Sequence, residues 1–192
     1  TTLRYRGKAV DLTAPWERLS MVEAFGRYAK MDLLRALTRK TIVSQARKKG
    51  YAVRDTDGWE ELFDQIFLNE VEPHLGRGKP TILYDYPIAL AALSQKKKSD
   101  PRFAERFELY IEGLELGDGY SELTDWKEQL ARFHLEHEQR KQLGKTEHPI
   151  DMDFIQALKV GMPSAGGIAV GVDRLIMLFA DVNDIADTMF FP

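Results

Sequence analysis

The 192-residue chain contains no cysteine, which excludes disulfide bonds, zinc–thiolate sites and cysteine nucleophiles. It also lacks an apolar run of membrane-spanning length and a signal-peptide pattern, so we expect a cytoplasmic protein without membrane contact. The formal net charge is only −3, which disfavours a general nucleic-acid-binding surface. The chain has just four histidines, and their spacing does not predict a metal site.

Apolar residues make up 44% of the chain, which is enough for a globular domain with a sizeable core. The opening residues LRYRGKAVDL predict a hairpin. Helical periodicity follows over residues 20–37, 41–49 and 59–71, where Ser20 and Glu23 form a capping-box pattern. We interpret residues 20–78, approximately, as a helical insert that does not contribute to the main sheet.

Strand patterns return with PTILYDYP at residues 80–87. A long polar helix is predicted over residues 126–142, with Thr124 or Asp125 as its cap, and a short helix over residues 151–160. A glycine-broken apolar strand then leads into a helix near Val172. The last residues, DIADTMFFP, predict a short helix followed by an apolar tail.

Residues 106–125, RFELYIEGLELGDGYSELTD, predict an antiparallel hairpin. The apolar alternation changes phase between Ile111 and Leu114, which a two-residue turn at residues 112–113 explains. This turn pairs Tyr110 with Glu115, and it pairs Glu108 with Gly117. The two glutamates therefore lie on one face, opposite the apolar row.

Glu108 and Glu115 are diagonal neighbours in this register, with Cα atoms within roughly 8 Å of each other. Carboxylates at that distance repel unless a cation lies between them. A divalent metal that carries a polyphosphate would satisfy both groups. The alternative is a charged strand that is solvated or protected against edge-to-edge aggregation.

The segment SAGGIAVGVDRLIMLF places three glycines, Gly166, Gly167 and Gly171, in a passage from strand to helix. Bare backbone there would allow a flat ligand to approach closely. Arg174 falls in the first helical turn, and a guanidinium can stack on a base and pair with phosphate. The alternative is a tightly packed strand followed by a surface arginine.

GLELGDGYSELTD and GGIAVGVDR together resemble the C-terminal part of the class II aminoacyl-tRNA synthetase catalytic domain, specifically the lysyl type. GVDR resembles the third signature motif of that class, and the resemblance runs through most of the chain. It implies an α+β fold, with an antiparallel sheet flanked by helices. Within this family, the chain resembles the paralogous ligases that attach β-lysine to elongation factor P. Three features carry this resemblance: HPIDMDFIQALKVGMP, DLTAPWERLS and Ala169.

The resemblance also implies a nucleotide site. Glu108 and Glu115 would hold Mg²⁺ and ATP, and Leu116 would touch the nucleotide. Gly171 and Arg174 would receive the adenine and the triphosphate, with Arg174 as the catalytic residue.

For the amino acid, lysine or β-lysine, the resemblance implies that Glu122 binds the side-chain ammonium and Tyr120 flanks the substrate. The Ala169 methyl would reshape the pocket. Asp118 replaces the usual asparagine and adds negative charge there. Strand parity places Glu122 opposite Glu115, so we predict a β-bulge at residues 117–119 to bring both to one face.

Two signature motifs of the class would lie upstream of Thr1, one at the dimer interface and one holding the α-phosphate. We therefore expect the C-terminal portion of a longer, homodimeric ligase, inactive when alone. The favoured activity is ATP-dependent activation of a lysine-type amino acid and transfer to a lysine of elongation factor P. The alternatives are a lysyl-tRNA synthetase acting on tRNA-Lys and a non-catalytic lysine-binding or partner-binding paralogue.

Overall fold

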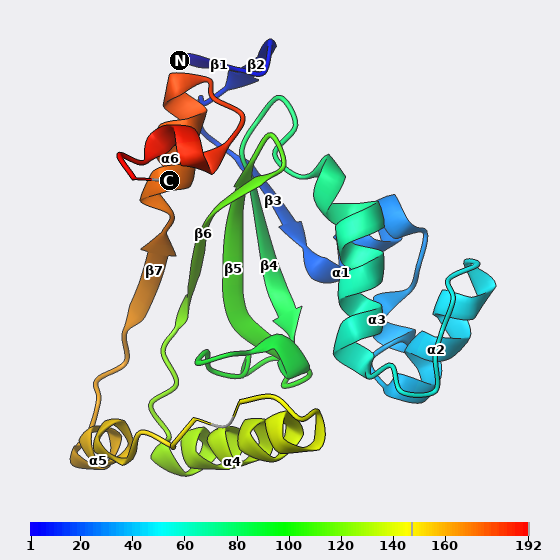
Figure 1. Ribbon diagram of the computed structural model, residues 1–192, viewed down its shortest axis with the longest axis vertical. Helices are drawn as coiled ribbons and strands as arrows, with labels where there is room; N and C mark the ends of the chain where they lie inside the picture. Colours follow the sequence, from blue (N-terminus) through cyan, green and yellow to red (C-terminus); the bar gives the residue numbers. More distant parts are fainter. Residues whose placement is uncertain (147, 192) are drawn as a thin grey trace.

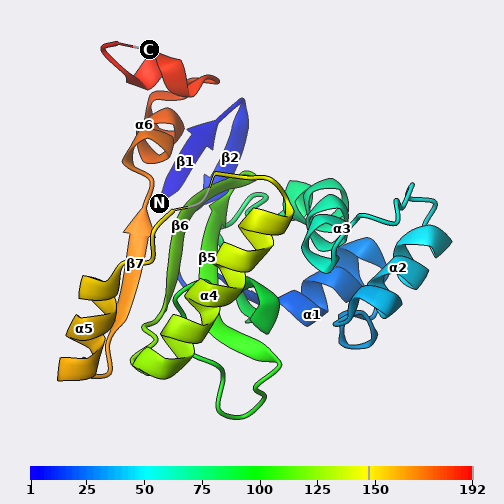
Figure 2. The ribbon, with the colours of Figure 1, turned by 60° about the horizontal axis from the view of Figure 1, so that its bottom comes forward.

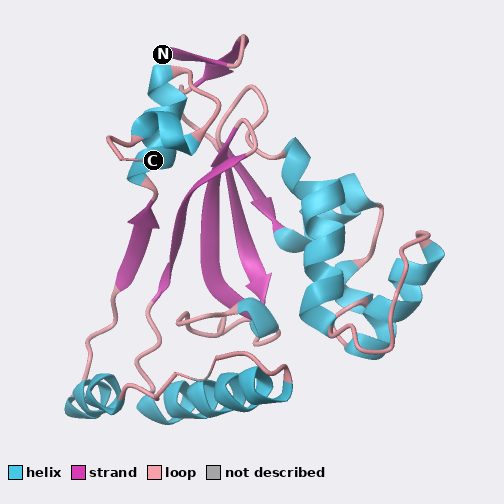
Figure 3. Ribbon diagram, viewed as in Figure 1, coloured by secondary structure: helices cyan, strands magenta, loops and turns pink. Residues whose placement is uncertain are grey.

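The computed structural model describes residues 1–146 and 148–191. Its centre is a five-stranded sheet in the order β3-β4-β5-β6-β7, and a separate two-stranded sheet pairs β1 with β2 (Figure 1). The strands are β1 (Thr2–Tyr5), β2 (Lys8–Asp11), β3 (Glu17–Ser20), β4 (Thr81–Pro87), β5 (Phe103–Ile111), β6 (Leu114–Ser121) and β7 (Gly166–Val170). Helices flank this sheet, as Figure 3 shows, so the expected α+β class is confirmed.

The sheet is mixed, which differs from the purely antiparallel sheet that we expected. β3 and β4 are parallel, whereas the other three strand pairs of this sheet are antiparallel. A parallel pair needs a long crossover connection. Here the chain leaves β3 and passes through the helices of residues 21–74 before it returns in β4.

The crossover contains α1 (Met21–Ala24), α2 (Arg39–Lys48) and α3 (Trp59–Ile66). The predicted Ser20 capping box is present, because Ser20 N–H donates to Glu23 Oε2 (2.9 Å) and Glu23 N–H donates to Ser20 Oγ (3.2 Å). The single helix expected over residues 20–37 is wrong. It ends in a left-handed Lys30, after a π-helical stretch, and a short 3₁₀ turn follows.

The remaining helices agree with the sequence patterns. α4 (Trp126–Gln142) is capped by Asp125, α5 (Met152–Val160) by Asp151, and α6 (Val172–Ala180) begins directly after Gly171. Short helical stretches cover Phe25–Ala29, Leu33–Arg35, Phe67–Val71, Glu72–His74, Ile88–Leu90 and Ile185–Thr188. In Figures 1 and 2, α4 and α5 lie near the ends of β6 and β7, to which they are joined.

Two hydrophobic clusters hold the molecule together. The larger one packs the crossover helices against β3 and β4, and it includes Phe25, Phe63 and Leu83. The smaller one joins the β1–β2 hairpin and α6 to the sheet, through residues such as Tyr5 and Leu178. No helix among residues 1–146 and 148–191 is long and apolar enough to span a bilayer.

Gly76 joins the crossover to the tip of the β5–β6 hairpin by a backbone hydrogen bond and close packing. Its carbonyl accepts a hydrogen bond from the Glu112 N–H (2.9 Å), and its φ is +70°. A Cβ at this position would lie 2.6 Å from the Tyr110 carbonyl oxygen and 2.7 Å from the Ile111 backbone. Only glycine fits here without moving the hairpin.

We therefore predict that Gly76→Ala lowers the free energy of unfolding by about 2 kcal/mol or more, because strain at positive φ adds to overpacking. Urea denaturation measures this loss. Gly78→Ala is a matched control, since Gly78 has the same φ of +70° but no neighbour within 4 Å of the added Cβ. Equal losses in the two variants would contradict the proposed close packing of Gly76.

Candidate functional site

A β-bulge in β6 determines the geometry of the site. Tyr110 pairs with Glu115, as predicted, but Leu109 pairs with Gly117, so Leu116 is the extra residue. The predicted pairing of Glu108 with Gly117 is wrong, because Glu108 pairs with Asp118. The bulge therefore exists, but it lies at Leu116 rather than at residues 117–119.

This bulge gathers the predicted polar residues on one face of the sheet. After the extra residue, Asp118 and Tyr120 lie on the same face as Glu108, and they pair across the sheet with Glu108 and Arg106. On the other side, Ala169 pairs with Asp118. We call the face that carries Glu108, Glu115, Asp118, Tyr120 and Glu122 the acidic face.

Glu122 reaches this face because Gly167 has no side chain. Gly167 pairs with Tyr120, and a Cβ on Gly167 would lie 2.7 Å from Glu122 Oε1. The Glu122 side chain is half-buried. The glycine-rich segment predicted open space for a ligand beside the backbone. At Gly167 that space is filled by the Glu122 carboxylate.

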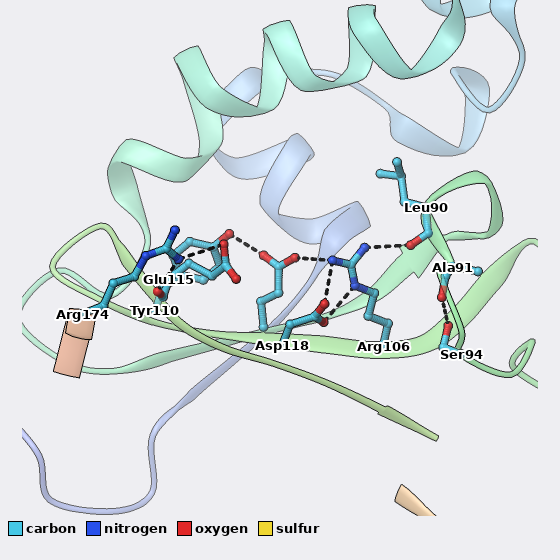
Figure 4. A network of polar contacts seen from close by, with 9 residues as sticks. Leu90, Ala91, Ser94, Arg106, Tyr110, Glu115, Asp118 and Arg174 are labelled. Atoms are coloured by element: carbon cyan, nitrogen blue, oxygen red, sulfur yellow. Dashed lines mark hydrogen bonds and ion pairs between the residues drawn. The ribbon is translucent and has the colours of Figure 1, made fainter. Parts of the chain in front are cut away.

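Arg106 is the centre of a network of ion pairs on the acidic face (Figure 4). It grips Asp118 with two bonds, from Nε to Oδ1 (2.9 Å) and from Nη2 to Oδ2 (3.0 Å), and it donates from Nη2 to Glu108 Oε1 (2.9 Å). Its Nη1 donates to the Leu90 carbonyl (2.8 Å), and the guanidinium lies 4.6 Å from the Tyr86 ring centroid. A planar fork with this many partners fixes two strands and two carboxylates at once.

Glu108 is nearly enclosed, with 6% of its surface exposed. Its Oε2 accepts a hydrogen bond from the Tyr110 hydroxyl (2.5 Å), while its Oε1 accepts from Arg106. Burial raises the pKa of Glu108, and the hydrogen bonds and the charge of Arg106 oppose that shift. Both oxygens therefore already have a partner, and each keeps lone-pair capacity for a further one.

Arg174 and Gly171, at the start of α6, lie against the bulge. Arg174 Nη1 donates to the Glu115 carbonyl (2.8 Å) and lies 3.4 Å from Glu115 Oε2. The Gly171 N–H donates to the Leu116 carbonyl (2.9 Å). The Leu116 side chain, however, is 3% exposed and belongs to the hydrophobic cluster on the opposite face. The nucleotide contact that the resemblance implies for Leu116 would therefore involve its backbone and not its side chain.

Glu72 also belongs to this end of the acidic face, although the sequence analysis did not single it out. Burial raises the pKa of Glu72, the negative charge of Glu115 raises it further, and Arg174 opposes both effects. Glu72 comes from the crossover, far from the hairpin in sequence, and a lone glutamate before Pro73 carries no pattern that would have identified it.

The donor set fits a metal that arrives with a ligand. Among the described residues, no group of three or more Asp, Glu or His side chains could hold a metal ion. Mg²⁺, however, is commonly bound by one or two carboxylates together with substrate phosphates and water. Glu108 and Glu115 share the acidic face and supply two such carboxylates, and the Arg174 guanidinium beside them can bind phosphate.

The whole chain, residues 1–192, matches the family described as tRNA synthetases class II (D, K and N). A lysine–tRNA ligase of Dehalococcoides mccartyi (strain CBDB1) is 39% identical over 192 residues, which are 100% of this chain and 38% of that protein. Two elongation factor P–(R)-beta-lysine ligases are also similar, from Haemophilus ducreyi (42%) and Proteus mirabilis (43%). Each of these alignments covers 177 residues, 92% of this chain and 54% of the relative. The chain thus spans about half the length of these ligases or less.

We predict that Arg106→Lys lowers the free energy of unfolding by about 2 kcal/mol, because lysine keeps the charge but cannot grip Asp118 with two bonds in a largely buried site. Thermal or urea unfolding tests this. Arg102→Lys is the matched control, since Arg102 also makes a two-bonded contact, with Asp100, but its side chain is 55% exposed. A loss at Arg102 as large as that at Arg106 would refute the role given to the Arg106 network.

Proposed function

Because the chain belongs to the class II tRNA synthetases (D, K and N), we propose that it forms part of a ligase that activates a lysine-type amino acid with ATP and transfers it to a lysine of elongation factor P. The elongation factor P ligases match this chain at 41–43% identity, slightly above the 37–39% of the lysine–tRNA ligases. Ala169, one of the positions on which the resemblance to the elongation factor P ligases rests, is consistent with the same choice.

The observation that carries this proposal is the state of Glu122. Asp118 and Glu108 are paired with Arg106, and Glu115 lies beside Arg174. Within the part of the chain that the structure describes, the half-buried Glu122 carboxylate has no such cationic partner. A partly buried carboxylate without a counter-charge is costly, and an incoming ammonium group would remove that cost.

The charge of the acidic face supports a cationic guest. Together with Glu72, the face has five acidic side chains, whereas Arg106 and Arg174 are its two basic ones. Asp118 is paired with Arg106, so we assign Asp118 a structural role in the site. The negative charge that Asp118 adds is compensated by this arginine. Tyr120 follows Asp118 on this face and precedes Glu122. Burial, and then the charges of Glu122 and Asp118, raise the pKa of Tyr120. This arrangement suits the side chain of lysine or β-lysine.

In the proposed activation step, a carboxylate oxygen of the amino acid forms a bond to the α-phosphorus of ATP while the bond from that phosphorus to the bridging oxygen breaks. Pyrophosphate leaves and an aminoacyl-adenylate remains. Mg²⁺, when bound through Glu108 and Glu115, would neutralise phosphate charge. The Arg174 guanidinium would bind and orient the triphosphate, so that catalysis rests on positioning and charge stabilisation.

In the second step, the uncharged ε-amine of an acceptor lysine attacks the acyl carbonyl, an amide bond forms, AMP leaves, and the amine loses a proton. The lysine–tRNA ligase relatives support a second candidate, in which a tRNA-Lys hydroxyl attacks the same carbonyl and forms an ester. In both candidates a lysine-type amino acid is first activated as an aminoacyl-adenylate, so the acidic face would serve either reaction.

We predict that Glu122→Gln weakens the binding of lysine and β-lysine by about 10- to 100-fold, because an ammonium then loses its charged partner, while ATP binding is unchanged. Isothermal titration calorimetry with each ligand measures this. Glu105→Gln is the control, since Glu105 is also half-buried on β5 but faces the opposite side of the sheet. Unchanged lysine binding in the Glu122 variant would show that this carboxylate does not recognise the ammonium.

The acceptor is tested by offering radiolabelled lysine or β-lysine, ATP and Mg²⁺ to the complete ligase that contains this chain, together with elongation factor P or tRNA-Lys. We expect label in elongation factor P, stable to mild base, because an amide resists hydrolysis. Base-labile label in tRNA-Lys alone would establish the second candidate and reject transfer to protein.

A further inference from the structure

A second charged surface lies on the crossover, away from the acidic face. Residues 30–49 contain seven lysines or arginines and one aspartate, a net charge of +6 in a chain whose total is −3. The rest of the chain therefore carries −9, and the molecule is electrostatically polarised. Figures 1 and 2 both place α2, which lies in this stretch, at the end of the molecule away from β6 and β7.

The cations of α2 lie at both of its ends. Arg47 and Lys48 in the last turn suit the helix dipole, whereas the two cations of the first turn do not. The helix RKTIVSQARK contains four cations and no acid, so no ion pair within the helix offsets their repulsion. Arg39 and Lys40 occupy its first turn, where the helix dipole already disfavours positive charge. Lys40 and Ser44, and then Arg47 and Lys48, continue the exposed side of the helix. A bound anion would relieve the repulsion between neighbouring cations and, in the first turn, the unfavourable interaction with the helix dipole.

These side chains line a groove of about 720 Å³ between α2 and the loop that follows it. Its lining consists of four cations, two valines, one serine and one aspartate: Arg39, Lys40, Arg47, Lys48, Val43, Val53, Ser44 and Asp55. Arg39 ties the loop to the helix by donating to the carbonyls of Asp57 (2.8 Å) and Asp55 (2.6 Å).

Among the residues that the structure describes, none of the four cations in the groove is paired with a carboxylate, and Arg39 donates only to backbone carbonyls. Lys49 is paired with Glu70, and Arg35 is paired with Asp32, but both of these lie outside the groove lining. Within residues 1–146 and 148–191, the side chains of Lys40, Arg47 and Lys48 make no ion pair or hydrogen bond. We call the surface formed by Arg39, Lys40, Arg47 and Lys48 the basic groove.

We propose that the basic groove binds an acidic protein segment whose carboxylates pair with Lys40, Arg47 and Lys48 and whose aliphatic side chains pack on Val43 and Val53. Charge complementarity supports an anionic partner. The lining favours protein over nucleic acid, because it includes two valines and an aspartate and has no aromatic ring on which a base could stack. The strongly negative remainder of the chain would also repel a long phosphate backbone.

The groove is far from the acidic face, so its occupation acts on partner binding rather than on the chemistry at Glu122 or Arg174. The inference does not depend on the proposed function, because an acidic partner could dock there whichever acceptor is used. Long-range attraction of this kind steers association and weakens as salt screens it.

The test is fluorescence anisotropy with a labelled peptide rich in Glu and Leu, and in parallel with a labelled RNA duplex. We expect the protein to bind the peptide, with an affinity that falls as salt is added. The triple variant K40E/R47E/K48E should lose about tenfold or more of that affinity, because three attractive contacts become repulsive. Lysine binding by calorimetry should be unchanged in the same variant, which separates this result from the proposed function.

The matched control is R4E/K98E/K141E, which reverses three other exposed cations that lie outside the groove. It changes the net charge by the same amount and should leave peptide affinity within about twofold. The proposal is overturned if the unmodified protein does not bind the peptide, or if both variants lose the same peptide affinity. It is also overturned if the RNA duplex binds more tightly than the peptide and only the groove variant loses RNA affinity. The last outcome would assign the groove to nucleic acid.

Discussion

The extra residue at Leu116 is the constraint on which the rest of the site depends. A strand alternates its side chains between two faces, so an insertion of one residue reverses every position that follows. Before the bulge, β6 presents Glu115 to the acidic face, and after it, β6 presents Asp118 and Tyr120 to that same face. Without the bulge, Glu122 would lie opposite Glu115, and an amine and a phosphate group could not be bound on one side of the sheet.

Charge compensation organises what the bulge brings together. The Arg106 fork neutralises Asp118 and Glu108 at one end, and Arg174 offsets Glu115 at the other. Among the described residues, Glu122 has no such partner, and in the proposed function it meets the ammonium group of the substrate. A face rich in carboxylates is stable before a ligand arrives only if most of its charges are already paired, so the two arginines give the acidic face structural support.

Local features were predictable from the sequence, whereas long-range ones were not. The turn at Glu112 and Gly113 was expected from the phase change, and both residues have positive φ, as a tight hairpin turn requires. The Ser20 capping box was likewise local. The position of the bulge was not, because Gly117 and Gly119 are more permissive than Leu116. What decides the position is burial of the Leu116 side chain in a cluster that includes Tyr5 and Leu178. The Arg106 network and Glu72 depend on strand register and on the crossover, which no short motif encodes.

The central claim is that the acidic face binds the amino acid and the nucleotide together. A crystal structure of the protein with lysine and a non-hydrolysable ATP analogue tests this most directly. The account predicts the side-chain ammonium within hydrogen-bonding distance of Glu122 and the phosphates beside Arg174. A hollow on the opposite face of the sheet is lined by residues such as Ile82, Phe107 and Ile168. Density for either ligand against those side chains would contradict the account.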